Sequence, residues 1–123
     1  ASDVYKRQRL DAADRVKVKV TKHGIDGAIQ IISMLSSAGK RAVLGHVFET
    51  GLAAVAEAHL AMLFPDIIGP HEIGSMEPLG VADKILQQDP YCDHGSITIP
   101  EGVGLGVSVD WEQIENFKVN LSF

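Results

Sequence analysis

Alternating apolar and polar residues near the start of the chain predict a β-strand. Residues 15–21 read Arg-Val-Lys-Val-Lys-Val-Thr, which places three valines on one face and Lys17 and Lys19 on the other. Apolar residues at helical spacing follow, from a candidate N-cap at Asp26 to a glycine stop at Gly39. The first predicted unit is therefore a strand followed by a helix.

The same order occurs again along the next part of the chain. Residues 42–46 form a second apolar strand pattern, and residues 51–64 form an alanine-rich helix that ends before Pro65. A third short apolar strand follows at residues 67–68. Alternating strands and helices with short connections predict an α/β fold in which helices cover a parallel sheet.

The spacing of these units favours one kind of α/β fold. The ends of successive strands lie at Lys19, His46 and Glu72, about 26 to 27 residues apart. Near-equal spacing, without a glycine fingerprint for phosphate, favours a (β/α) barrel of the TIM type over a doubly wound sheet. Because a complete barrel needs about 250 residues, we expect this chain to hold about three of eight units, as the C-terminal part of the barrel.

The tail of the sequence differs from these repeats. Residues 94–100 and 104–110 predict two short alternating strands joined by glycine turns, and residues 112–117 predict a short terminal helix. Such a segment does not continue a strand-helix repeat. We therefore expect residues 93–123 to pack as an elaboration on another part of the molecule, with residues 9–92 forming the barrel units.

The first eight residues, ASDVYKRQ, match the in-frame translation of a sequencing adapter, and the sequence has no initiating Met. We expect residues 1–8 to be a scar that is excluded from fold reasoning, as in a metagenomic fragment, and the protein to begin before this sequence. The alternative is a natural, charged N-terminal strand. Leaving out these residues changes the net charge from −5 to about −6, which alters none of the inferences below.

Composition narrows the class of protein. A net charge of −5 with 46% hydrophobic residues fits one globular core and argues against nucleic-acid or anionic-membrane partners, which usually require clustered Lys and Arg. The single cysteine, Cys92, excludes an internal disulfide and fits a reducing cytoplasm, where we expect the protein to reside. No apolar run approaches the roughly 18 residues that span a bilayer.

Lys19 is the first candidate for chemistry. If the valine face packs on helices, Lys17 and Lys19 point into the barrel, where an unpaired charge is costly. A lysine near the carboxyl end of such a strand is partly desolvated, which lowers its pKa and makes it a plausible proton acceptor. The alternative is an exposed edge strand whose lysines discourage aggregation.

Further polar residues follow the second and third strands. His46 and Glu49 come at the turn after the second strand, and His71 and Glu72 hold the equivalent place one unit later. Each also has a structural interpretation, because strand-end histidines are often only hydrogen-bonded and acidic residues favour helix starts. A metal site built from His46, His71 and Glu72 matches no known ligand spacing.

Three other features carry weaker signals. Lys22 and His23 lie in the loop after Lys19, where we expect them to be solvated. His59 falls inside the apolar helix, where we expect a hydrogen-bonded, partly buried imidazole. The glycine-rich residues 102–106 are not a phosphate loop, because no Lys-Ser/Thr pair and no helix start follow them.

Three ordered motifs resemble one family. Residues 18–24, Val-Lys-Val-Thr-Lys-His-Gly, are similar to the sixth-strand motif of the muconate-lactonizing and dipeptide-epimerase branches of the enolase superfamily, related to mandelate racemase. In that motif Lys-x-x-Lys precedes Gly-Gly, and the first lysine is an acid/base catalyst. Residues 45–59 resemble the seventh strand and helix. Residues 93–107 resemble the ending that returns to the capping domain, and the likeness spans residues 10–117.

The resemblance implies a Mg²⁺-dependent enzyme that removes a proton α to the carboxylate of a small substrate and forms an enediolate, whose charge the metal stabilises. Lys19 would be one of two opposed bases, and Glu49 matches a position that helps to hold substrate. The second base and the three metal ligands would lie on strands two to five, so we expect no metal ligand here. We also expect the full-length protein to be a homo-oligomer and the present chain alone to be inactive.

Departures from the family pattern bear on the assignments. Gly24 is followed by Ile25, and Val103 stands where the family has proline. His46 matches the catalytic histidine of the mandelate-racemase branch, but Lys19 stands where its aspartate partner would be. We therefore assign Lys19 as the catalytic base and interpret His46, Glu49 and Glu72 as substrate-binding residues.

Several reaction classes remain open at this point. The resemblance favours an isomerase, namely a racemase, epimerase or cycloisomerase. A dehydratase of a hydroxy or amino acid, which is a lyase, is the alternative within the superfamily, because the same enediolate can expel a β-hydroxyl. A non-catalytic barrel homologue or a binding domain is the alternative from another class.

Overall fold

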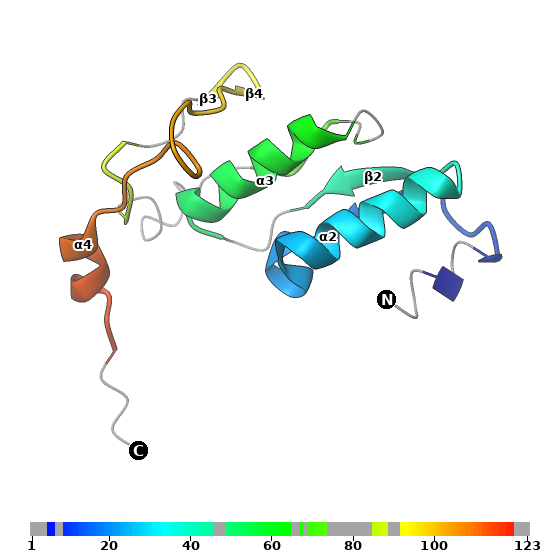
Figure 1. Ribbon diagram of the computed structural model, residues 1–123, viewed down its shortest axis with the longest axis horizontal. Helices are drawn as coiled ribbons and strands as arrows, with labels where there is room; N and C mark the ends of the chain where they lie inside the picture. Colours follow the sequence, from blue (N-terminus) through cyan, green and yellow to red (C-terminus); the bar gives the residue numbers. More distant parts are fainter. Residues whose placement is uncertain are drawn as a thin grey trace.

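Two parallel strands and two helices form the main body of the computed structural model (Figure 1). The structure describes residues 5–6, 9–45, 49–64, 67, 69–73, 85–88 and 92–119. The elements are β1 (Arg15–Val18), α2 (Val20–Ser37), β2 (Arg41–Leu44), α3 (Gly51–Leu63), β3 (Cys92–Asp93), β4 (Ser96–Ile97) and α4 (Trp111–Asn116).

β2 is the central strand of the parallel sheet. It pairs with β1 along the whole length of both strands, with Val18 opposite Leu44 at the carboxyl end. On its other side, Ala42 forms a parallel bridge with Ile67, and the amide of Glu72 donates to the Leu44 carbonyl at 3.1 Å. The predicted α/β class with parallel strands is therefore confirmed, whereas closure into a barrel stays a prediction.

The core lies between this sheet and the helices. α2 contacts both strands as well as α3, and the two helices lie side by side in Figure 1. The valine face of β1 packs against α2, as the alternation predicted. The buried residues of this hydrophobic core are Val18, Val20, Ala28, Ile31, Ile32, Leu35, Ala42, Leu44, Leu60 and Ile67. Within the described ranges, no helix has the length and apolar content needed to cross a bilayer.

The boundary between the first strand and helix differs from the prediction. β1 ends at Val18 and α2 begins at Val20 with Lys19 as its N-cap residue, so one helical turn precedes the predicted start near Asp26. Gly24 adopts φ 67 and interrupts the helix after its first turn. The alternating pattern placed the end of the strand too late, because Val20 is buried whether it ends a strand or begins a helix. Gly39 follows the end of α2 with φ 68, as expected of a glycine stop.

The tail also departs from the predicted strands. β3 and β4 form a short antiparallel hairpin that turns at His94 and Gly95, both with positive φ. Residues 104–110 form turns and one antiparallel bridge, from Val109 to Leu86, because glycines with positive φ curve the chain there. The predicted terminal helix is present as α4, with the Asp110 carboxylate accepting the Gln113 amide at 3.0 Å.

His59 joins this tail to the main body. Its Nε2 lies 3.1 Å from the carbonyl oxygen of Leu105, and the imidazole is half-buried on α3. This confirms the structural interpretation of His59. It also places the glycine-rich turn against α3, so the tail packs beside the helix instead of extending the parallel sheet.

We expect Gly106→Ala to destabilise the tail more than Gly104→Ala. Both glycines have positive φ, which costs an alanine about 1 kcal/mol. At Gly106 a Cβ would also lie 2.7 Å from the backbone oxygen of Pro100, whereas at Gly104 it would meet nothing within 4 Å. Urea unfolding of the full-length protein should show a loss of about 2 kcal/mol or more for Gly106→Ala. Equal losses for the two variants would contradict the close approach of Pro100.

Candidate functional site

Three chain segments end at the same edge of the sheet, because their strands run parallel. Lys19 follows β1, Glu49 lies beyond β2, and Glu72 binds the end of β2 through its amide. Lys19 is half-buried, Glu49 is buried and Glu72 is exposed. The structure therefore brings three of the four predicted site residues to one edge. The fourth, His46, lies outside the described residues.

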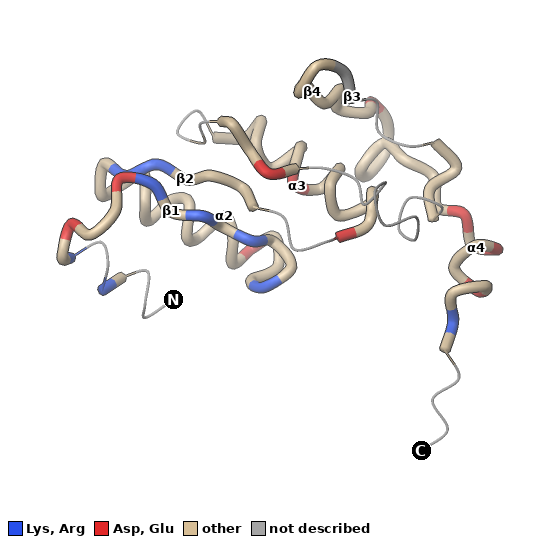
Figure 2. The backbone as a smooth tube through the Cα atoms, turned by 180° about the vertical axis from the view of Figure 1, so that it is seen from behind, with Lys and Arg blue, Asp and Glu red and all other residues tan. Residues whose placement is uncertain are grey.

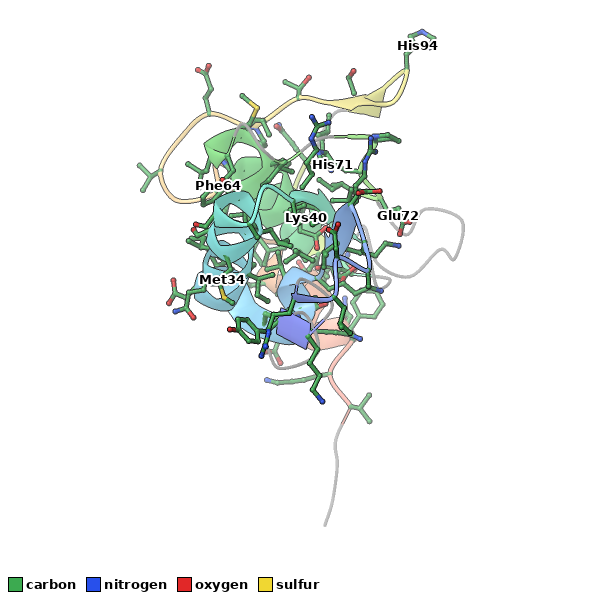
Figure 3. All side chains as sticks on the ribbon, turned by 90° about the vertical axis from the view of Figure 1, so that its right-hand side faces the viewer. Met34, Lys40, Phe64, His71, Glu72 and His94 are labelled. Carbon is green, nitrogen blue, oxygen red and sulfur yellow. The ribbon has the colours of Figure 1, made fainter. Side chains whose placement is uncertain are left out.

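Glu72, labelled in Figure 3, forms an ion pair with Lys17. The aliphatic part of Lys17 passes over Gly45, where a Cβ would lie only 2.4 Å from Lys17 Cγ and Cδ. A glycine at this position therefore leaves room for the lysine. Both charged side chains are substantially exposed, so the pair contributes at most about 1 kcal/mol to stability. Its effect is to set the charge of this face, since it neutralises Glu72.

Two acidic side chains, Glu49 and Glu57, are buried. The Thr21 hydroxyl, in the first turn of α2, donates to Glu49 Oε1 at 2.8 Å. Glu57, from α3, is 0% exposed, and among the described residues neither of its carboxylate oxygens completes a hydrogen bond. Glu49 is therefore bound to the first turn of α2.

The environment of Glu57 favours its neutral form. Burial raises its pKa to about 7, and the negative charge of Glu49 acts in the same direction. The Val20 amide and the Lys19 ammonium oppose this shift. Glu57 therefore retains its proton well above the usual range of a glutamate. Sequence reasoning missed this residue, although an isolated acidic residue in an otherwise apolar helix was a usable signal.

Charges of both signs gather around the site. Figure 2 shows Lys and Arg along β1 and at the beginning of α2, whereas α3 carries one acidic residue, Glu57. The half-buried Lys19 lies between β1 and α2 in the chain. A lysine so placed can exchange a proton with a group at the edge of the sheet while neighbouring carboxylates balance its charge.

The other described histidines differ in their surroundings. His71 borders a cavity of about 250 Å³ between residues 69–73 and the β3–β4 hairpin. Burial lowers the pKa of His71, and its Nδ1 has no hydrogen-bond partner among the described residues. His94 lies at the outer tip of the hairpin, away from His71 and Glu72 (Figure 3). Lys22 and His23 are exposed, as expected.

The described residues at this edge do not gather into a metal site. Within the described ranges, no group of three His, Cys, Asp or Glu side chains is placed to hold a metal ion. The two acids nearest the edge have partners, since Glu49 accepts from Thr21 and Glu72 pairs with Lys17. The expectation that any metal ligands lie elsewhere in the full-length protein stays a prediction.

Comparison with known proteins assigns the chain to a family. A family model described as "Enolase C-terminal domain-like" matches residues 3–114. The chain belongs to this family. The resemblance of the three sequence motifs to the enolase superfamily is thereby confirmed, and so is an α/β fold of the enolase C-terminal domain type.

Relatives of this enolase-like chain are isomerases. Muconate cycloisomerase 1-1 from Acinetobacter lwoffii is 27% identical over 94% of this chain and 30% of its own length. An isomerase from Streptomyces coelicolor A3(2) is 28% identical, with a TM-score of 0.78 over 94% of this chain and 31% of its own. A dipeptide epimerase from Cytophaga hutchinsonii, whose structure contains Mg and the dipeptide D-Ala-L-Val, is 25% identical, with a TM-score of 0.79 over the same shares. The chain thus spans about 30% of the length of the curated relatives that it matches.

Proposed function

We propose that this chain is part of an isomerase that removes and returns a proton at the carbon α to a substrate carboxylate. Abstraction of this weakly acidic proton requires a positioned base and stabilisation of the enediolate that results. The enolase-like fold and the isomerase relatives support this reaction class. The substrate of the full-length protein belongs to the small carboxylates, as do muconate and D-Ala-L-Val.

The placement of Lys19 carries the proposal. It is half-buried and follows the carboxyl end of β1 with an extended backbone. Because it is also the residue from which α2 begins, its backbone is held by strand pairing on one side and by the helix on the other. A base must be held in place to act on one face of a substrate. Lys19 therefore serves as one of the two bases.

The other predicted residues contact the substrate in this proposal. Glu72, whose charge is balanced by Lys17, binds a polar group of the substrate from its exposed position. Glu49 and His46, which lie between β2 and α3 in the sequence, help to hold the substrate. The remaining barrel units, the second base and the Mg²⁺ ligands come from the full-length protein. Bound Mg²⁺ would there stabilise the charge of the enediolate. Residues 93–123 belong with the capping domain.

Recovery of the upstream reading frame tests this proposal without knowledge of the substrate. We expect it to encode a Lys-x-Lys motif at the end of the second barrel strand. Acidic residues should end each of the next three strands, because oxygen ligands are those that Mg²⁺ prefers. An upstream frame without the second-strand lysine and the three acidic strand ends would contradict the enzymatic function and favour a binding protein.

A further inference from the structure

Lys17 is a charged residue of the sheet to which the proposed reaction gives no role of its own. It belongs to β1, and because side chains alternate along a strand, it lies on the face opposite the buried Val18. In a barrel this face points inward, where branched apolar residues are usual and a lysine is costly unless it is paired. Its pairing with Glu72 indicates what the lysine does there.

Three neighbouring chain segments hold this ion pair in place. β1 carries Lys17. Gly45, directly after β2, donates its amide to the Val18 carbonyl at 3.0 Å, so its backbone continues the pairing with β1. On the other side of β2, the amide of Glu72 donates to the Leu44 carbonyl at 3.1 Å. Both charged side chains therefore extend from backbone that the sheet fixes.

Gly45 provides the path by which Lys17 reaches Glu72. A Cβ at Gly45 would collide with Lys17 Cγ and Cδ, which lie too near the backbone to swing aside as the end of the side chain could. The backbone of Gly45 does not adopt the left-handed conformation that favours glycine. What the missing side chain provides at this position is therefore clearance for the lysine.

We propose that Lys17 determines substrate specificity: by neutralising Glu72, it makes the site prefer a carboxylate whose second polar group is a neutral hydrogen-bond donor, such as an acylated amine, over one with a free ammonium. This inference rests on the proposed function, in which Glu72 binds the substrate. A carboxylate can accept about four hydrogen bonds, so a glutamate that binds a lysine can also accept from an amide N–H. An unbalanced glutamate would attract an ammonium, which the ammonium of Lys17 repels.

Lys17→Met tests this selection, because methionine is unbranched and fits the path over Gly45 without a charge. Titration calorimetry with the full-length protein measures the binding of amino acids and dipeptides, each as the free amine and as the N-acetyl form. We expect the preference for the N-acetyl form to fall about tenfold in Lys17→Met. Gly45→Ala, which displaces the lysine and keeps the net charge, should lower the preference in the same direction.

Lys40→Met is the matched control. Lys40 directly precedes β2, at the opposite end of the sheet, and pairs with Asp11. The control therefore removes the same charge and the same kind of ion pair, and we expect it to keep the wild-type preference. A wild-type preference in Lys17→Met, or a panel in which neither form of any member binds, would overturn the proposed selection.

A crystal structure of the full-length protein tests the ion pair without a substrate. We expect Lys17 to extend over Gly45 and to bind Glu72. A Lys17 bound to an acidic residue of another strand would overturn the proposal even if Lys19 proved to be the base. Conversely, the expected change of preference in Lys17→Met, together with α-proton exchange that persists on both faces in Lys19→Ala, would count against the catalytic role of Lys19 alone.

Discussion

Replacing Lys19 with alanine is expected to abolish solvent exchange of the substrate α-proton on one face and to leave exchange on the other face intact. The reason is that Lys19, half-buried after β1, is proposed to act on one side of the bound substrate. Loss of a general base typically costs about 100- to 10,000-fold in rate. Exchange in D₂O with full-length protein, followed by NMR, measures the two faces separately.

Lys118→Ala provides the matched control for this experiment. Lys118 is exposed, follows α4 and pairs with Glu115, three residues before it. We expect its removal to leave exchange on both faces unchanged. A carboxylate screen that begins with D-Ala-L-Val and muconate supplies the substrate. Exchange that persists on both faces in Lys19→Ala would show that another group is the base.

The stability of the full-length protein should fall by about 3 kcal/mol between about pH 4.5 and pH 7 through Glu57 alone. The folded-state pKa of Glu57 is raised to about 7 from an ordinary value of 4.5. Below 4.5 the carboxyl is protonated in both states, so its contribution to stability is fully present. As the pH rises, the unfolded chain releases the proton first, and stability is lost until the folded carboxyl also ionises.

Comparison with Glu57→Gln isolates this contribution from every other titrating group. Urea unfolding of both proteins at several pH values gives the difference in free energy of unfolding. We expect this difference to change by about 3 kcal/mol across the window and to be constant above it. A difference that does not vary with pH would mean that Glu57 ionises in the folded protein as easily as in the unfolded chain, and is not buried as described.

The sequence predicted the parallel strand-helix order because burial on one face dictates it. The alternation of valines in residues 15–21 identified the buried face of β1, and the position of Lys19 at the strand end followed from it. The same alternation could not separate the strand from the first turn of α2, since Val20 is buried in either conformation. Only tertiary packing decides that boundary.

The partners of the candidate site were harder to predict. The ion pair of Lys17 with Glu72 joins residues 55 positions apart and depends on the missing side chain at Gly45. No local pattern encodes such a contact. Glu57 left a trace in the sequence, as an acidic residue in an apolar helix. Its complete burial depends on how α3 packs, which the sequence pattern alone does not specify.

The geometry around Lys19 in the full-length protein tests the central claim most directly. A crystal structure with a substrate identified by the exchange screen measures the distance from Lys19 Nζ to the carbon that bears the exchanging proton. We predict about 3 to 3.5 Å, the range in which proton transfer is possible. A Lys19 side chain directed away from the substrate, with another base at that distance, would contradict the account.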